Sequence, residues 1–294
     1  MDKVAVAYQQ LIDRFVQWAE DEENVRAAIV IGSRARDDHP ADEWSDLDVI
    51  IYARDPQSLW GTTGWLHHVG EPLLTFVEPT PDGVGHERRV LFAGGLDVDF
   101  VPDPVAGLRQ MLADGLPPDD ADMIRRGVRV LVDKDGLAAR LVGSTVDPPT
   151  YLPPSEPEFL NLVHDFWYHA VWAGKHLRRG ELWRAKGCCD RYLKHLLQQM
   201  MAWHAHASRG DDVDTWMRGR FLEEWADPRA VEALPAIFAH YDEQDVWRAL
   251  AATMDLFRWL AVETADRWGY AYPVLGEEGA TELVRRMRAG SSLL

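Results

Sequence analysis

Acidic residues lie inside two apolar segments that read as strands, and this feature most restricts how the chain can fold. Residues 46–53 read DLDVIIYA, and residues 96–101 read LDVDFV. Because side chains alternate along a strand, Asp46 and Asp48 share one face while Leu47 lies on the other. Carboxylates inside strands carry a large desolvation cost unless a cation offsets it. The sequence therefore predicts neighbouring strands whose carboxylates converge on a cation.

A turn suited to phosphate binding precedes these strands. The apolar run 25–31 ends at Gly32 and Ser33, which can offer backbone N–H groups and a hydroxyl to phosphate oxygens. Mg²⁺ typically binds a few carboxylates together with substrate phosphates. The combination predicts a two-metal site for phosphoryl or nucleotidyl transfer. The alternative, that the acidic residues are unrelated, leaves their burial unexplained. Arg34 and Arg36 beside the turn either neutralise phosphate charge or are solvated loop residues.

These residues resemble the motif of the nucleotidyltransferase superfamily, the DNA polymerase β-like enzymes. That motif is Gly-Ser, a short spacer, Asp-x-Asp, and a third acidic residue on a later strand. The spacer here, Arg34 to Ser45, is twelve residues long. In the family the third carboxylate stands near the start of its strand, before an apolar run and a proline. This register selects Asp97 as the third ligand and makes Asp99 an additional charge on the same face.

Longer stretches are similar to the aminoglycoside 6-adenylyltransferase (streptomycin adenylyltransferase) family over about residues 8–273. They are GSRA at 32–35, SDLDV at 45–49, LDVDFVP at 96–102, VDKDG at 132–136, DFW at 165–167, KHLRRGELWRA at 175–185 and GYAYP at 269–273. The resemblance implies transfer of AMP from ATP to a hydroxyl of streptomycin, with release of pyrophosphate. It implies two Mg²⁺ ions held by three carboxylates: Asp46, Asp48 and Asp97. It also implies a set of triphosphate contacts: Gly32, Ser33, Arg34 and Lys175. The alternatives are an ordinary strand-to-helix turn at Gly32 and Ser33 and a solvated helix lysine at Lys175.

In related antibiotic nucleotidyltransferases a carboxylate of the helical domain removes the proton from the acceptor hydroxyl. Two residues are candidates for this general base. Glu181 follows Gly180 at a helix start, where it would otherwise only make a favourable contact with the helix dipole. Asp190 lies four residues from both Lys186 and Lys194, where it would otherwise form surface ion pairs. The resemblance is closer around Glu181, so we expect Glu181 to be the base and keep Asp190 as the alternative.

The chain is acidic, with a formal net charge of −17 over 294 residues. This charge argues against nucleic-acid binding and suits a polycationic aminoglycoside, although acidity also serves solubility. Cys188 and Cys189 are adjacent in a helical stretch, so we expect no disulfide. The N-terminal segment MDKVAVAYQQLIDRF carries charges where a signal peptide needs an apolar core, so we expect no signal peptide, and no apolar run is long enough to span a membrane. We expect a cytoplasmic protein without a membrane partner, a monomer or weak dimer.

Strand and helix patterns divide the chain in two. Strands are expected at 25–31, 46–53, 71–78, 88–93, 96–101 and 129–132, with helices at 3–20, 104–113 and 119–125. Five prolines in 147–157 indicate a linker, and helical spacing follows at 158–179, 182–207, 229–240 and 245–268. The predicted fold class is α+β. A mixed-sheet α/β nucleotidyltransferase domain (1–146) and the linker (147–157) precede a helical substrate-binding bundle (158–294).

Two other functions fit the same residues. One is the same chemistry on a different acceptor, such as another aminocyclitol, a nucleotide or a protein side chain. The other is a nucleotide-binding regulator that has lost turnover. The intact set of carboxylates argues against the regulator, because a silent protein has no need to keep a costly acidic cluster.

Overall fold

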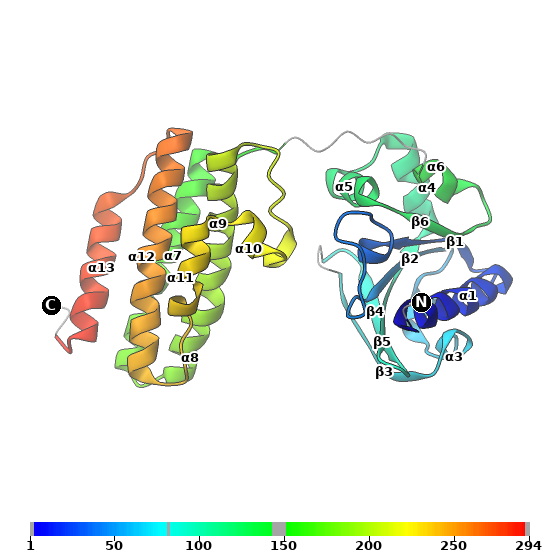
Figure 1. The fold of residues 1–294 in the computed structure, drawn as a ribbon, viewed down its shortest axis with the longest axis horizontal. Coiled ribbons are helices and arrows are strands. Elements are labelled where there is room, and N and C mark those ends of the chain that lie inside the picture. The colour runs from blue at the N-terminus through cyan, green and yellow to red at the C-terminus, as the bar shows by residue number, and fades with distance from the viewer. Residues whose placement is uncertain (1–2, 81–82, 143–150, 292–294) are drawn as a thin grey trace. The chain divides into compact units, whose positions relative to one another are not determined.

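The computed structural model describes residues 3–80, 83–142 and 151–291 (Figure 1). The chain divides into two compact units, Met1–Pro149 and Thr150–Leu294. This division falls within the predicted linker 147–157, whose residues up to 150 lie outside the described part of the chain. Each unit has its own hydrophobic core, as expected of an independent domain.

A mixed sheet forms the centre of the first unit (Figure 1). Its described strands are β1 (Val25–Ile31), β2 (Leu47–Ala53), β3 (Pro72–Pro79), β4 (His86–Phe92), β5 (Leu96–Pro104) and β6 (Arg129–Asp133). They lie in the order β3-β4-β5-β2-β1-β6. The pairing of β2 with β5 is parallel, and every other neighbouring pair is antiparallel. The structure thus confirms the mixed sheet and the hairpin expected at Gly94 and Gly95.

Helices cover both faces of this sheet. They are α1 (Lys3–Asp21), α2 (Gln57–Gly61), α3 (Leu66–Val69), α4 (Val105–Asp114), α5 (Pro118–Arg126) and α6 (Leu137–Val142). Strand alternation separates two cores, because Ile51 packs in one cluster with Phe15 of α1 and Ile50 packs in another with Leu108 of α4. The helices α2, α3 and α6 were not predicted, since segments this short carry little periodicity.

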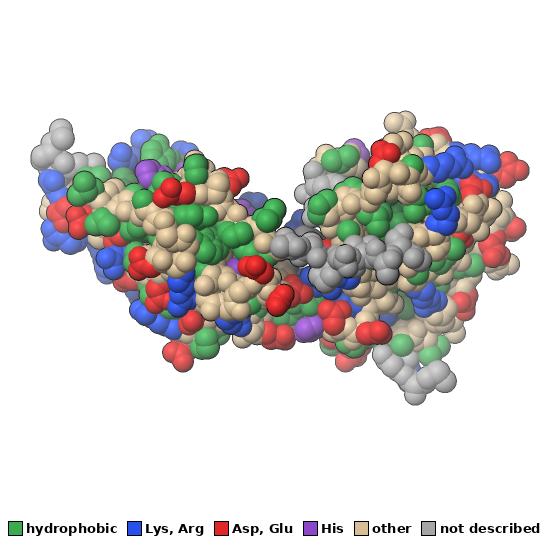
Figure 2. All heavy atoms as spheres, turned by 90° about the horizontal axis from the view of Figure 1, so that it is seen from above, with side chains coloured by type: hydrophobic (Ala, Val, Ile, Leu, Met, Phe, Trp, Pro, Cys, Tyr) green, Lys and Arg blue, Asp and Glu red, His purple; other side chains and the backbone are tan. Residues whose placement is uncertain are grey.

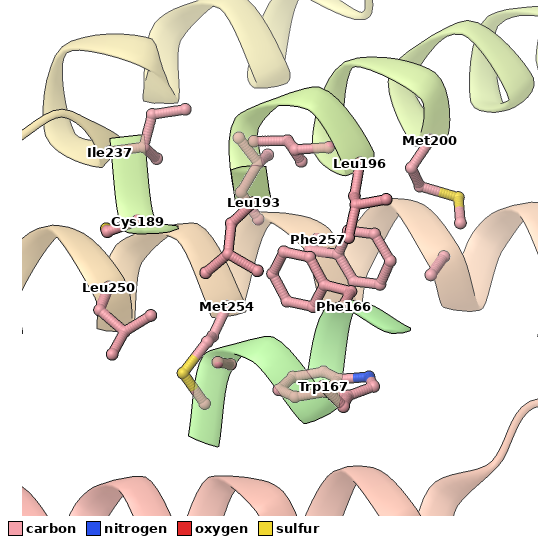
Figure 3. Packing of buried hydrophobic residues seen from close by; sticks show 14 of the residues in the cluster. Phe166, Trp167, Cys189, Leu193, Leu196, Met200, Ile237, Leu250, Met254 and Phe257 are labelled. Atoms are coloured by element: carbon pink, nitrogen blue, oxygen red, sulfur yellow. The ribbon is translucent and has the colours of Figure 1, made fainter. Parts of the chain in front are cut away.

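The second unit is helical in its described residues (Figure 1). Its elements are α7 (Glu156–Arg178), α8 (Leu182–Gly187), a π-helix (Cys188–Tyr192), α9 (Leu193–Arg209), a 3₁₀ turn (Met217–Gly219), α10 (Leu222–Trp225), α11 (Pro228–Ile237), α12 (Glu243–Trp268) and α13 (Val274–Arg288). The rings of Phe166 and Phe257 stack with centroids 3.6 Å apart and join α7 to α12 (Figure 3). The helical bundle is confirmed, although the predicted helix 182–207 contains the π-helix, and α13 was missed.

Capping side chains set the ends of the two longest helices. Ser155 and Glu158 form a reciprocal capping box at the start of α7. The helix expected from residue 245 begins earlier, because the backbone N–H of Asp245 donates to the carboxylate of Asp242, which is the N-cap of α12. Gly269 ends that helix after Trp268, the last residue of the expected helix, at φ 72°, in the left-handed conformation that glycine adopts at low cost.

The surface is charged, as the composition requires. On the face seen in Figure 2, acidic and basic side chains are interspersed over both units. Among the described residues, no helix is both long enough and apolar enough to cross a membrane.

Candidate active site

Strand pairing brings three carboxylates together in the first unit. In the parallel pair of β2 and β5, Asp48 lies opposite Asp99, and Asp46 lies just before β2. One carboxylate oxygen from each of Asp46, Asp48 and Asp99 lies within 4.8 Å of the other two. Asp46 is exposed, Asp48 is half-buried and Asp99 is buried. Oxygen atoms at this spacing suit a hard divalent cation shared between strands.

The predicted choice of Asp97 over Asp99 differs from this geometry. The strand register places Val98 opposite Leu47, so Asp97 lies before the first residue of β5 that pairs with β2, and its side chain is exposed. The backbone N–H of Asp97 instead donates to the hydroxyl of Tyr8, at 3.0 Å. Both acidic residues point to the same face of the strand, so alternation could not separate them, and only the register against β2 does.

Gly32 lies directly against this cluster. It begins a 3₁₀ turn, Gly32–Arg34, that follows β1, and its φ is +71°. A Cβ atom at this position would lie 2.4 Å from Oδ2 of Asp48. The buried hydroxyl of Ser33 has no hydrogen-bond partner among the described residues. The turn therefore combines a close backbone approach to the carboxylates with an unsatisfied polar atom, and both features fit a metal-bound phosphate group.

Arg34 holds the loop that carries Asp46. Its guanidinium group donates to the backbone carbonyls of Asp46, at 2.8 Å, and Ser45, at 2.6 Å. The same group stacks over the ring of Tyr8, 3.5 Å from the ring centroid. The contacts give Arg34 a positioning role in the site, in addition to the phosphate contact that the resemblance implies.

Arg89 is a site residue that the sequence analysis missed. It lies opposite Asp99 in the antiparallel pair of β4 and β5, and its guanidinium is 3.2 Å from Oδ2 of Asp99. It also pairs with Glu87 at 2.9 Å and with Glu78 of β3 at 2.7 Å. The signal was an arginine within the strand sequence HERRVLF, but its partner is visible only once the strand register is known.

The electrostatic balance of the cluster favours an added cation. Burial raises the pKa of Asp99 to about 6, and the charges of Glu87, Asp46 and Asp97 raise it further, while Arg89 lowers it. Because Arg89 is shared among several carboxylates, it does not offset the effect of burial, and the pKa of Asp99 stays raised. A divalent cation bound to the cluster would reverse this preference, because it stabilises the ionised form.

The other predicted site residues lie in the second unit. Lys175 is exposed on α7. Glu181 contacts His176 through its Oε2, and its Oε1 accepts a hydrogen bond of 2.8 Å from Arg179. These partners, His176 first, lower the pKa of Glu181. The structure gives Glu181 an ion-pairing role beyond the helix-dipole contact expected at a helix start.

Asp190 lies in the π-helix Cys188–Tyr192. Its Oδ2 pairs with Lys186, as the spacing predicts, whereas its buried Oδ1 has no hydrogen-bond partner among the described residues. Lys194 points elsewhere, because its ammonium group donates to the hydroxyl of Thr253 at 2.9 Å. The predicted ladder of two lysines around Asp190 is thus reduced to one ion pair. π-Helical turns are frequent at functional sites.

The mixed sheet, the Gly-Ser turn and the convergent carboxylates are the parts of a nucleotidyltransferase centre. Residues 7–287 match the family model described as streptomycin adenylyltransferase, and the chain belongs to this family.

Similar proteins cover nearly the whole chain. An aminoglycoside 6-adenylyltransferase of Bacillus subtilis (strain 168) is 24% identical over 93% of this chain and 95% of its own length. A protein of the same name from Staphylococcus aureus is 21% identical over 90% of this chain and 93% of its own length. The crystal structure of an aminoglycoside 6-adenyltransferase from Bacillus subtilis is 19% identical over 95% of this chain and 97% of that one, with a TM-score of 0.45.

Proposed function

We propose that this protein is an enzyme that transfers AMP from ATP to a hydroxyl group of an aminoglycoside, with streptomycin as the acceptor. Membership of the streptomycin adenylyltransferase family supports the reaction class. The observation that carries the proposal is the convergence of Asp46, Asp48 and Asp99 beside the glycine turn at Gly32. The net charge of −17 is suited to a cationic acceptor.

The three carboxylates would hold Mg²⁺, with Asp46 and Asp48 from one strand segment and Asp99 from its parallel neighbour. Bound Mg²⁺ supplies charge neutralisation at the phosphates and polarises the α-phosphoryl group. Gly32 and Ser33 contact the triphosphate through the turn that ends β1.

In the reaction the acceptor oxygen forms a bond to the α-phosphorus, and the bond from that phosphorus to the bridging oxygen breaks. The electron pair of the broken bond leaves with pyrophosphate, and the hydroxyl proton passes to a general base. In-line positioning and charge stabilisation account for most of such a rate enhancement.

Of the two candidate bases, the surroundings favour Asp190. Both oxygens of Glu181 are engaged, one by the imidazole of His176 and the other by the guanidinium of Arg179, and its lowered pKa makes it a weaker base. Asp190 pairs with one cationic side chain, Lys186, through its Oδ2, and its Oδ1 accepts no hydrogen bond from a lysine or arginine among the described residues. Lys175, exposed on α7, is a triphosphate contact in this proposal.

One incubation tests the proposal. Purified protein, ATP, MgCl₂ and streptomycin are combined, and the product is examined by mass spectrometry alongside reactions with EDTA or without ATP. We expect an AMP adduct of streptomycin and free pyrophosphate only in the complete reaction. An AMP adduct of spectinomycin or kanamycin, with none of streptomycin, would show that the acceptor is a different aminocyclitol or aminoglycoside. ATP binding without any adduct would support the regulator instead.

A further inference from the structure

The second unit contains a large cavity that the nucleotide chemistry does not use. Its volume is about 1200 Å³, which exceeds the usual size of a small-ligand pocket. One wall is the face of α7 that carries Glu158, Asn161 and Asp165, which are spaced along one side of the helix. The facing wall is α9, which contributes Gln199 and Trp203 at the same kind of spacing.

The segment 151–157 forms a third side of this cavity, which is open to solvent, and side-chain contacts hold the segment in place. The hydroxyl of Tyr270 donates to the carbonyl of Pro154 at 2.6 Å. The backbone N–H of Ala271 donates to Glu156 at 2.7 Å. Tyr151 stacks on His206 with ring centroids 3.5 Å apart, and its buried hydroxyl has no hydrogen-bond partner among the described residues. The cavity is therefore preformed and contains an unsatisfied polar atom.

The charged side chains that line the cavity are acidic. Among the described residues that line the cavity, two are acidic and none is lysine or arginine. Asp165 is held by the Tyr192 hydroxyl at 2.9 Å and lies 2.6 Å from Nδ1 of His169. Hydrogen bonds from Ser155 lower the pKa of Glu158, so this carboxylate is ionised at neutral pH. Two oriented carboxylates with no lysine or arginine among the described lining residues favour a positively charged ligand.

The remaining lining chemistry matches a sugar. The side chains of Asn161 and Gln199 are exposed on facing helices, where their amides can bind hydroxyl groups. The half-buried rings of Trp203 and Tyr270 offer apolar faces to a pyranose ring or a guanidinium group.

We propose that this cavity between α7, α9 and segment 151–157 is the binding site for the cationic, polyhydroxylated acceptor. The inference rests on the proposed function for the identity of the ligand, but it concerns binding, which is measured in the absence of ATP and metal. Asp165 and Glu158 bind the amino or guanidino groups, and the amides of Asn161 and Gln199 bind sugar hydroxyls.

Titration calorimetry of the full-length protein with streptomycin, in the absence of ATP, tests the site. Asn161→Trp fills the cavity from an exposed helix position. Gln244→Trp is the matched control, because Gln244 is exposed in the first turn of α12, at the other end of the helix from Tyr270. Glu158→Gln removes a charge while keeping a residue that can form the capping box, and Glu243→Gln is its exposed control.

We expect Asn161→Trp to weaken streptomycin binding by about tenfold or more, and Glu158→Gln to weaken it and reduce its salt dependence. Both controls should bind like the wild type. Wild-type affinity in both cavity variants, or no streptomycin binding by the wild type, would overturn the site. The proposed function is judged separately. If the wild type binds streptomycin, Asn161→Trp abolishes this binding and the wild type transfers no AMP, the cavity assignment stands and the proposed AMP transfer is rejected.

Discussion

Replacing Asp99 by asparagine should stabilise the metal-free protein at neutral pH. Folding raises the pKa of this carboxyl from 3.8 to about 6, chiefly through burial. The folded state therefore binds more protons than the unfolded state between these values, and stability falls as pH rises through this window. A difference of about two pKa units corresponds to about 3 kcal/mol. Asparagine has nearly the same shape and no charge, and Arg89 keeps Glu78 and Glu87 as partners.

The assay is urea unfolding in EDTA at pH 7.5 and pH 4. At pH 7.5 we expect Asp99→Asn to raise the free energy of unfolding by up to about 3 kcal/mol, and we expect the gain to shrink toward pH 4. Asp97→Asn is the matched control, because Asp97 is exposed two residues away, and it should change stability little. A destabilised Asp99→Asn variant at pH 7.5, or a gain that does not depend on pH, would refute the reasoning.

Two further predictions concern the turn and the base. Gly32→Ala should lower the free energy of unfolding by about 1–3 kcal/mol and should weaken Mg²⁺ binding, because the added Cβ displaces Asp48. Gly83 has nearly the same φ but open space around an added Cβ, so Gly83→Ala should keep the wild-type affinity for Mg²⁺. Urea unfolding and calorimetric Mg²⁺ titration compare the two, and equal Mg²⁺ affinities would contradict the contact. Asp190→Asn should slow AMP transfer by about 10²-fold or more and remove the acidic limb of the pH–rate profile. Glu181→Gln should leave that limb in place, and the opposite ranking would restore Glu181 as the base.

Much of the catalytic sheet follows from local pattern. Asp46 and Asp48 alternate with apolar residues, so their shared face was predictable, and Gly32 stands where an apolar run breaks. The two acidic strands were also expected to lie side by side with their carboxylates converging, and the pairing of β2 with β5 places Asp48 opposite Asp99. These features depend on strand period and turn chemistry, which neighbouring residues determine.

Features that depend on strand register, or on contacts between residues far apart in the sequence, could not be predicted from local sequence pattern. Asp97 and Asp99 each stand between two apolar residues and share one face of the strand, and only the pairing of β5 with β2 distinguishes them. Arg89 enters the site through its position opposite Asp99 across a second strand pair. The π-helix at 188–192 interrupts a segment whose apolar spacing predicts one continuous helix, because backbone hydrogen bonding rather than side-chain pattern defines it.

The initial rate of AMP transfer to streptomycin, compared for the wild type, Asp99→Asn and Asp97→Asn at saturating Mg²⁺ and ATP, tests the central claim most directly. We expect the wild type to form the adduct, Asp97→Asn to retain most of the rate, and Asp99→Asn to lose about 10³-fold or more, because it removes a charged ligand from the shared cation. Absence of transfer by the wild type, or a greater loss in Asp97→Asn than in Asp99→Asn, would contradict the assignment of Asp46, Asp48 and Asp99 as the catalytic carboxylates.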